Sequence, residues 1–415
     1  MSRRILAKGH TASNDSMASG INLHDLIIGP SGAGKTRGYV IPNILQCNES
    51  MLVADTKGDL AKDLGPVLRD NGYEVIAVDL KNMADSFGYN PFDCIGVDER
   101  KNHCQQDILR IANVLCPTRS LNDPYWEGAA RQYLAALIAY TLECLPKNEC
   151  HLSTVAELLC HSPSGVVQTL MNELAHQHPA SFAVSQYRLY NVCSGAMRTQ
   201  ACVLGILAEK LNGLVFDDAV RMYTQPVRIH FEQLGKTKTA VFLTISDIDR
   251  SKDRLVSLFY AQALQALVGY ADSCPGSRLP VPVRFILDDF ATNAYIHDFD
   301  NIIATVRSRG IAISIILQSL TQLEALYGPA RAESIVNNCD TCIYLGGQDI
   351  HTADFISAKA DIPRSAILQM PVERGYLFVR RQAPTPICKY DLVDHPLYRQ
   401  LAENKQLASF EYTKG

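Results

Sequence analysis

Short β-branched runs alternate with amphipathic helical stretches over the first eighty residues of the chain. The pattern predicts strands at residues 23–28, 51–55 and 74–79, with helices at residues 34–45 and 60–70 between them. Strands that alternate with helices form a parallel sheet covered by helices on both faces. The predicted fold class is therefore α/β, with a mainly parallel sheet.

The pattern changes over residues 103–228, where long helical periodicities appear and no strand pattern interrupts them. Residues 125–145 carry one apolar stripe at helical spacing, made of Tyr133, Leu134, Leu137, Ile138 and Leu142. Beyond this region the alternation resumes, with strands predicted at residues 239–245, 283–287, 311–317, 342–345 and 376–379. We therefore expect an all-α domain, residues 103–228, inserted into a discontinuous α/β domain made of residues 1–102 and 229–415.

Composition narrows the class of protein only in part. With 47% hydrophobic residues, the 415-residue chain can fill a core and is expected to be globular. A formal net charge of −4 gives no general basic field, so any contact with DNA must come from local loops or an assembled ring. Thirteen cysteines without regular spacing, and a first twenty residues without the apolar stretch of a signal peptide, predict reduced thiols in the cytoplasm. The apolar run at 311–317 is far shorter than the ~20 residues that span a bilayer.

A glycine-rich loop carries the strongest chemical signal. Gly29 to Thr36 fits the pattern G-x-x-x-x-G-K-[ST], and a predicted strand precedes it and a helix follows. Backbone N–H groups of such a loop converge on phosphates, the lysine reaches the β and γ phosphates, and the hydroxyl binds Mg²⁺. The predicted nucleotide-binding residues are Gly29, Pro30, Ser31, Gly32, Ala33, Gly34, Lys35, Thr36 and Arg37.

Two carboxylates end the strand predicted at residues 283–287. P-loop proteins carry a second nucleotide-binding motif at the end of a strand, in which the first acid holds Mg²⁺ and the second polarises water. We therefore assign Asp288 to the metal together with Thr36, and Asp289 to catalysis. Asp289 is one methylene shorter than glutamate, so slow hydrolysis is a possible outcome.

Other polar residues near these motifs are open to two interpretations. Gln318 follows the strand at 311–317, where it is either a γ-phosphate sensor or a polar strand end. Arg307 and Arg309 lie between the acidic pair and Gln318; either one serves a neighbouring subunit as an arginine finger, or both belong to a solvated helix end. Residues 55–59, Asp-Thr-Lys-Gly-Asp, form either a ligand-binding edge or a turn.

Two further groups are better explained by ordinary structure. Arg250, Lys252 and Arg254 form a basic patch that could touch phosphates, although a solvated helix start is the more common arrangement. Cysteine and histidine pairs occur without a matching partner pair at zinc spacing, so we expect buried structural cysteines at Cys339, Cys342, Cys150 and Cys160.

Longer phrases of the sequence identify a family by resemblance. They are LIIGPSGAGKTRGYVIPNIL, VADTKGDL, YNPF at residues 89–92, FILDDFATNAYIHDFDNIIATVRSRGIAISIILQSLTQL and NCDTCIYLGG. Together they resemble the coupling-protein ATPases of type IV secretion, the TraG/TraD family of conjugative DNA transfer. The resemblance extends from about residue 24 to about residue 390.

The resemblance implies a RecA-like P-loop core with an inserted all-α domain, a hexameric ring, and ATP with Mg²⁺ as cofactors. It further implies partners: single-stranded DNA, a relaxase or relaxosome protein, and components of the type IV secretion channel. By position, Gly29 to Thr36 is similar to the family's first nucleotide motif and Asp288-Asp289 to its second. Gln318 and Arg307 stand where the family has its glutamine and proposed arginine finger.

Two features differ from the family pattern. Its members usually carry N-terminal transmembrane helices, whereas the P-loop begins here at Gly29; the expected location is cytoplasmic, at the cytoplasmic face of the membrane where an anchor or partner is present. They also usually have glutamate where Asp289 stands. The alternatives to a conjugation motor are a soluble FtsK/HerA-like DNA pump and a non-hydrolysing ATP-binding adaptor for secretion substrates.

Overall fold

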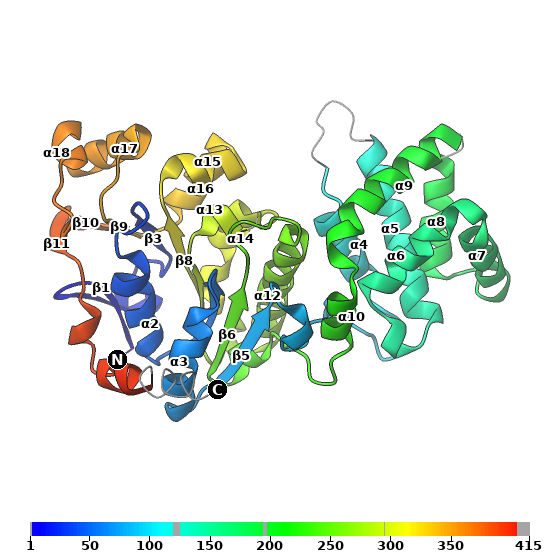
Figure 1. The fold of residues 1–415 in the computed structure, drawn as a ribbon, viewed down its shortest axis with the longest axis horizontal. Helices are drawn as coiled ribbons and strands as arrows, with labels where there is room; N and C mark the ends of the chain where they lie inside the picture. The colour runs from blue at the N-terminus through cyan, green and yellow to red at the C-terminus, as the bar shows by residue number, and fades with distance from the viewer. Residues whose placement is uncertain (1, 119–124, 194–196, 294, 405–415) are drawn as a thin grey trace, which may run out of the picture. The chain divides into compact units, whose positions relative to one another are not determined.

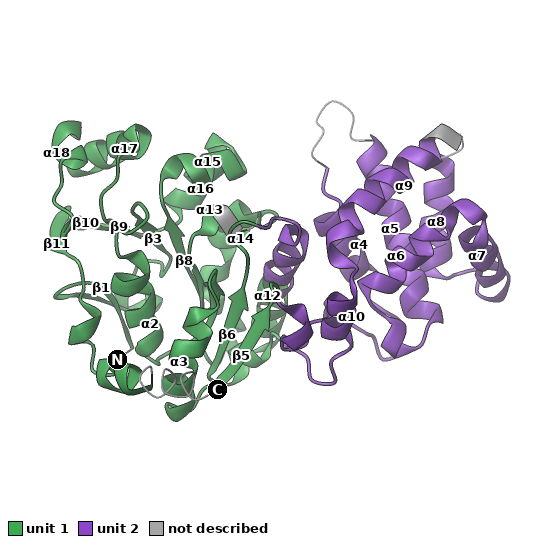
Figure 2. Ribbon diagram, viewed as in Figure 1, with its two compact units in different colours: residues 1–81, 231–248, 263–415 green, residues 82–230, 249–262 purple. Residues whose placement is uncertain are grey.

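A computed structural model describes residues 2–118, 125–193, 197–293 and 295–404. By contact density the chain divides into two compact units (Figure 2). Unit 1 contains residues 1–81, 231–248 and 263–415, and unit 2 contains residues 82–230 and 249–262. The chain passes from one unit to the other four times, so unit 1 is assembled from three segments that lie far apart in the sequence.

Unit 1 is built on a nine-stranded sheet with helices on both faces (Figure 1). Its strand order is β11-β10-β9-β3-β8-β7-β4-β6-β5, and all pairings from β9 to β5 are parallel. Strand β10 pairs antiparallel with both β9 and β11. The strands are β3 (Asp25–Ile28), β4 (Ser50–Asp55), β5 (Glu74–Asp79), β6 (Thr239–Thr244), β7 (Val283–Leu287), β8 (Ile311–Leu317), β9 (Thr341–Tyr344), β10 (Arg374–Val379) and β11 (Thr385–Cys388).

Three strands were absent from the sequence prediction. Strands β1 (Arg3–Ala7) and β2 (His10–Ser13) form a separate antiparallel hairpin, and β11 lies at the edge of the large sheet. Strand β2, with the sequence HTAS, is polar, and β11 contains Pro386. A proline without an N–H group is tolerated on an edge strand, but it argues against a strand when only the sequence is known.

The helices of unit 1 cover this sheet and border its carboxyl edge. They are α1 (Ser16–Ser19), a π-helical turn (Thr36–Val40), α2 (Ile41–Leu45), α3 (Asp59–Asp70), α11 (Gln233–Lys236), α13 (Phe290–Asn293), α14 (Phe299–Thr305), α15 (Leu320–Tyr327), α16 (Pro329–Asn337), α17 (Ile350–Ala360) and α18 (Arg364–Leu368). Helix α12 (Asp253–Ser273) has residues in both units.

The predicted continuous helix at residues 34–45 is wrong in one respect. The first turn after the P-loop is π-helical, with the N–H of Ile41 bonded to the carbonyl of Thr36, and an α-helix begins only at Ile41. Pro42 lacks the N–H group that a regular α-helix would direct at Gly38, which accounts for the break in the pattern.

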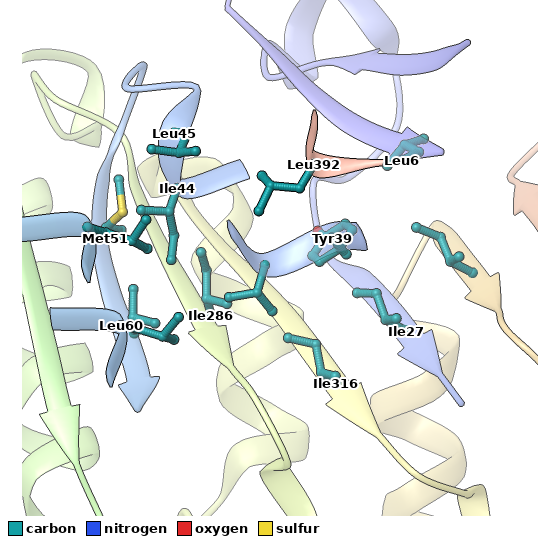
Figure 3. Packing of buried hydrophobic residues seen from close by; sticks show 14 of the residues in the cluster. Leu6, Ile27, Tyr39, Ile44, Leu45, Met51, Leu60, Ile286, Ile316 and Leu392 are labelled. Carbon is teal, nitrogen blue, oxygen red and sulfur yellow. The ribbon is translucent and has the colours of Figure 1, made fainter. Parts of the chain in front are cut away.

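Apolar side chains fix the P-loop helix onto the sheet. Tyr39 and Ile44 pack against a cluster that includes Ile27 of β3, Ile286 of β7 and Ile316 of β8 (Figure 3). All five side chains are at most 2% exposed. The burial of this segment against three neighbouring strands sets the position of Thr36, at its start, and of Lys35, directly before it.

Unit 2 is helical in its described part. Helix α5 contacts α4, α6, α8 and α9. Its residues 133–141 are buried on all sides, so the single predicted stripe understates its burial, and Leu142 is only half-buried. The helices are α4 (Gln105–Leu115), α5 (Tyr125–Cys144), α6 (Leu152–Cys160), α7 (Val166–Gln177), α8 (Phe182–Cys193), α9 (Met197–Leu211) and α10 (Asp217–Thr224).

Candidate nucleotide-binding site

The P-loop lies at the carboxyl end of β3, in the middle of the sheet. Gly32 and Gly34 have φ of +76° and +83°, and no heavy atom lies within 4 Å of the place where a Cβ would be. Both glycines are exposed, as are Pro30 and Ser31, whereas Ala33 is buried and its N–H bonds to the carbonyl of Pro30. The loop therefore has the glycine conformation and the open space that a polyphosphate requires.

Lys35 lies along this loop. Its Nζ donates to the carbonyl of Gly29 at 2.7 Å and to that of Pro30 at 3.1 Å. Desolvation lowers the pKa of Lys35, and the nearby carboxylates of Asp289 and Asp288 oppose that shift. The ammonium group is thus held at the P-loop and close to two acids.

Thr36 and Asp288 are in direct contact. The Thr36 hydroxyl donates to Oδ2 of Asp288 at 2.7 Å, and Oδ1 of Asp288 accepts the N–H of Asp289 at 3.1 Å. Asp288 is 8% exposed, and this burial raises the pKa of its carboxyl group, while the bond from Thr36 lowers it. A hydroxyl and a carboxylate held together in this way are oxygen ligands of the kind that Mg²⁺ prefers.

Asp289 has an unusual backbone. Its φ is +48°, a conformation that aspartate adopts more readily than most residues. The turn directs its carboxylate toward Gln318, whose Nε2 lies 3.5 Å from Oδ1 of Asp289. Gln318 directly follows β8, which lies between β3 and β7, so it stands between the P-loop and the acidic pair.

Two other predicted site residues, Arg37 for nucleotide binding and Arg307 for catalysis, lie apart from this group. Arg37 is exposed on the first turn after the P-loop, with Nη2 3.8 Å from Oδ1 of Asp391. Arg307 is exposed in the 3₁₀ turn Val306–Arg309, which precedes β8, whereas Gln318 follows the other end of that strand. A seven-residue strand is about 23 Å long, so Arg307 is not close to the P-loop of its own chain. Its neighbour Arg309 forms a two-point ion pair with Asp272, at 2.8 and 3.1 Å.

The segment after β4 has a structural explanation. The carboxylate of Asp55 accepts the N–H groups of Gly58 at 2.9 Å and Ala61 at 3.0 Å. Gly58 has a φ of +78°, which suits this turn. Asp55 is therefore engaged with the start of α3.

The basic patch is engaged with neighbouring side chains. Arg250 pairs with Asp253 at 2.6 Å, and Arg254 pairs with Glu209 at 2.9 Å. The ammonium group of Lys252 lies 5.6 Å from the centre of the Phe216 ring.

The cysteine prediction is partly wrong. Cys339 and Cys342 are buried, as expected, but Cys150 is half-buried and Cys160 is exposed at the end of α6. The apolar periodicity of a short helix does not tell which end of it meets solvent.

The loop that follows β9 borders the P-loop, although its residues were not among the predicted site residues. Gly346 and Gly347 follow β9, the other neighbour of β3, and Cδ of Pro30 lies 3.8 Å from the position of a Cβ on Gly347. The signal in the sequence was the double glycine itself, directly after a predicted strand.

The described residues fit a magnesium-bound nucleotide by their donor chemistry. Exposed loop glycines, one ammonium group, and a hydroxyl beside a carboxylate meet at one edge of the sheet. Thr36 and Asp288 would hold the metal, and the loop with Lys35 would hold the phosphates.

A family model described as Type IV secretory system Conjugative DNA transfer matches residues 5–360. The chain belongs to this family, that of the type IV secretion coupling proteins. Similar curated proteins include VirD4 of Rhizobium radiobacter, 23% identical over 361 residues, which cover 82% of this chain and 48% of that protein. TraG of Rhizobium radiobacter is 23% identical over 356 residues, 81% of this chain and 52% of TraG. The chain spans about half the length of the curated relatives it matches.

Several solved structures have a similar fold, and two of them are of the coupling protein TrwB. Unbound TrwBdeltaN70 matches with a TM-score of 0.69 and 17% identity, covering 94% of this chain and 89% of that one. TrwB in complex with the ATP analogue ADPNP matches with a TM-score of 0.67 and 17% identity, covering 94% and 95%. VirB4 of Thermoanaerobacter pseudethanolicus gives 0.54 at 12% identity, covering 91% of each chain. The predicted RecA-like α/β fold with its helical domain is confirmed.

No helix in the described part of this coupling protein is both long and apolar enough to cross a bilayer.

Proposed function

We propose that this chain is the ATP-hydrolysing part of a coupling protein that delivers relaxase-bound single-stranded DNA to a type IV secretion channel during conjugation. Membership of the conjugative DNA transfer family supports the general role. The structural neighbour TrwB, solved with ADPNP and with ADP and Mg²⁺, supports a nucleotide and magnesium as cofactors.

The 2.7 Å contact between Thr36 and Asp288 carries the proposal. It brings the two expected metal ligands together beside Lys35, at the open loop that would receive the phosphates. Magnesium bound there would neutralise negative charge on the phosphate oxygens. Lys35 would move from the carbonyls of Gly29 and Pro30 to the β and γ phosphates.

Asp289 and Gln318 would act on the attacking water. The Asp289 carboxylate orients the water and accepts its proton, and the Gln318 amide donates to an oxygen beside it. Their separation of 3.5 Å leaves the two groups adjacent without a short, rigid bond.

Arg307 would serve a neighbouring copy of the chain. It is exposed, and it lies at the opposite end of β8 from Gln318, so only a second subunit could bring it to a P-loop. An arginine finger supplied in this way requires an oligomer, and we propose a hexameric ring. Arg309, paired with Asp272, is less suited to the role.

The remaining partners follow from the family role. We propose that the helical unit receives the relaxase or relaxosome protein, and that the assembled protein works in the cytoplasm at the inner face of the membrane. Contact with DNA would be directed at the backbone and sensitive to salt. The side chains of Arg250, Lys252 and Arg254 would have to leave their present partners to take part.

Steady-state ATP turnover with and without DNA tests this function. Stimulation by single strands supports the conjugation motor, and stimulation by duplex alone supports an FtsK/HerA-like pump instead. Tight ATP binding without turnover, in a sample shown by light scattering to be oligomeric, supports the non-hydrolysing adaptor. The oligomer measurement is needed because shared sites do not form in a monomer.

A further inference from the structure

A row of polar side chains crosses the middle of the sheet below the nucleotide site. Asp25 of β3 pairs in register with Ser314 of β8 on one side and with Thr341 of β9 on the other. All three side chains are fully buried. Polar residues in the interior of a parallel sheet need hydrogen-bond partners, because an unpaired group there is costly.

Asp25 accepts from three other residues. Arg4 of the N-terminal hairpin reaches its Oδ2 at 2.8 Å, the Tyr39 hydroxyl donates to Oδ2 at 2.6 Å, and Nη1 of Arg284 lies 3.3 Å away. Desolvation raises the pKa of Tyr39 well above its ordinary value, with the Asp25 charge adding to the shift, so this hydroxyl remains a donor. Tyr39 also bonds to Ser314 at 2.9 Å.

Arg284 extends the row to the far side of β7. It donates to Ser314 at 3.1 Å and to the carbonyl of Leu23 at 3.0 Å, and it forms an ion pair with Glu49, directly before β4. The positive charges of two arginines thus balance the negative charges of two acids, and all four side chains are at most 8% exposed: Arg4, Arg284, Asp25 and Glu49. Buried ion pairs often add little net stability, so their presence calls for another explanation, such as fixing one arrangement of the strands.

The members of this network lie close to the site along the chain. Tyr39 is three residues after Thr36, on the same helical turn, and Arg284 is four residues before Asp288 on β7. Tyr39 lies over the strands that carry Ile27, Ile286 and Ile316 (Figure 3). Strands β3 and β7 are not neighbours, since β8 separates them. The network therefore links the helix of one metal ligand to the strand of the other.

We propose that Tyr39, Asp25 and Arg284 are positioning residues for the magnesium pair: they set the spacing between Thr36 and Asp288. This inference rests on the proposed function, because it assigns a role in binding Mg²⁺ with ATP. These residues act through the helical turn and the strand and do not contact the metal ligands, and removing such a coupled residue typically changes affinity at the other site about two- to thirtyfold.

The test is the Mg²⁺ dependence of ATP binding, measured by isothermal titration calorimetry at a series of MgCl₂ concentrations. Tyr39→Phe and Ser314→Ala each remove one hydroxyl of the network and leave the charges in place. We expect each variant to need about two- to thirtyfold more Mg²⁺ for half-maximal enhancement of ATP affinity. The affinity for ATP in EDTA should stay the same, since the P-loop and Lys35 are untouched.

Tyr223→Phe is the matched control. Its hydroxyl is also buried and donates at 3.0 Å to a backbone carbonyl, that of Leu214, within unit 2. Tyr223→Phe should lower the melting temperature by about as much as Tyr39→Phe does, but it should leave the Mg²⁺ dependence of ATP binding unchanged.

The other outcomes are decisive as well. A normal Mg²⁺ dependence in both network variants overturns the inference, and so does an equal loss of affinity with and without Mg²⁺. If ATP binding by the unaltered protein does not respond to Mg²⁺ at all, the proposed function fails first and the inference fails with it.

Discussion

The hydroxyl of Thr36 donates a 2.7 Å hydrogen bond to the carboxylate of Asp288, although 252 positions separate the two residues in the chain. Thr36 is the last residue of the P-loop, which follows β3, and Asp288 directly follows β7, with β8 between these two strands. A parallel sheet brings the carboxyl ends of its strands to one edge, which is where such proteins bind ligands. The contact makes the two motifs one site.

Replacing Lys35 by alanine should weaken ATP binding. The ammonium group supplies charge-assisted bonds to phosphate, so we expect the dissociation constant to rise about ten- to a hundredfold. Fluorescence titration with an ATP analogue measures the change. Lys147→Ala, an exposed lysine in the 3₁₀ turn Lys147–Glu149 of unit 2, is the control, and retention of normal affinity by Lys35→Ala would refute the assignment.

Asp288→Asn should stabilise the ligand-free protein while removing magnesium-dependent binding. Burial raises the pKa of Asp288, so the folded state favours the protonated form more than the unfolded state does. Asp288 therefore contributes to the free energy of unfolding at low pH, and this contribution is lost as the pH rises through its raised pKa. At neutral pH the asparagine variant should melt roughly 1–3 °C higher.

The pH dependence of that difference is its own control. The gain in melting temperature should shrink as the pH is lowered, because Asp288 becomes protonated in the unaltered protein as well. A lower melting temperature for the variant at neutral pH would contradict the stated effect of burial.

Asp289→Asn should separate binding from turnover. Asparagine also tolerates a φ of +48°, so the backbone conformation is retained. Its amide oxygen can still face Gln318, but the carboxylate that accepts a proton is lost. We expect turnover to fall about 10²- to 10⁴-fold, with the affinity for magnesium ATP little changed. Stopped-flow phosphate release measures this, and equal losses in binding and turnover would argue for a metal-holding role instead.

Asp289→Glu tests the length of the acid. Glutamate would reach one methylene farther toward water, but it adopts a positive φ less readily than aspartate. If the carboxylate of Asp289 is too short for fast hydrolysis, turnover by the glutamate variant should rise. A fall in turnover would mean that the backbone conformation is the stronger constraint.

Mixing two inactive variants tests whether Arg307 acts between subunits. Arg307→Ala should lower turnover by about 10³-fold and leave ATP binding intact. Lys35→Ala is defective in binding, but it retains Arg307. Mixed oligomers contain interfaces that join an intact P-loop to an intact arginine, so partial activity should return.

Arg309→Ala provides the comparison, since Arg309 is held by Asp272. It should affect the melting temperature more than turnover. If the mixed oligomers stay inactive although subunit exchange is demonstrated, a role for Arg307 in trans is refuted.

Local patterns were sufficient for much of the sheet. Strand β5 has the predicted limits, 74–79, and β7 and β8 do as well, because each is a short apolar run bounded by polar residues. The hairpin of β1 and β2 could not be predicted in this way. Arg4 is buried there beside Asp25, a residue of another strand that neutralises its charge.

For the site, too, some residues were predictable from local sequence and the positions of others were not. Residue type and spacing identified the P-loop and the two acids, since phosphate binding by backbone amides needs glycines, a lysine and a hydroxyl in a fixed local order. The side chains of Arg37 and Arg307 lie apart from the group that meets at Asp288, which local order cannot reveal.

The sequence by itself determined the fold class, the family and the P-loop, because short-range periodicity and a contiguous motif express them. Tertiary structure decided the contact of Thr36 with Asp288, the turn that aims Asp289 at Gln318, and the buried network of Arg4, Asp25, Tyr39 and Arg284. These depend on strand order in the sheet, which places residues far apart in the chain side by side, and on burial, which makes each polar group require a partner.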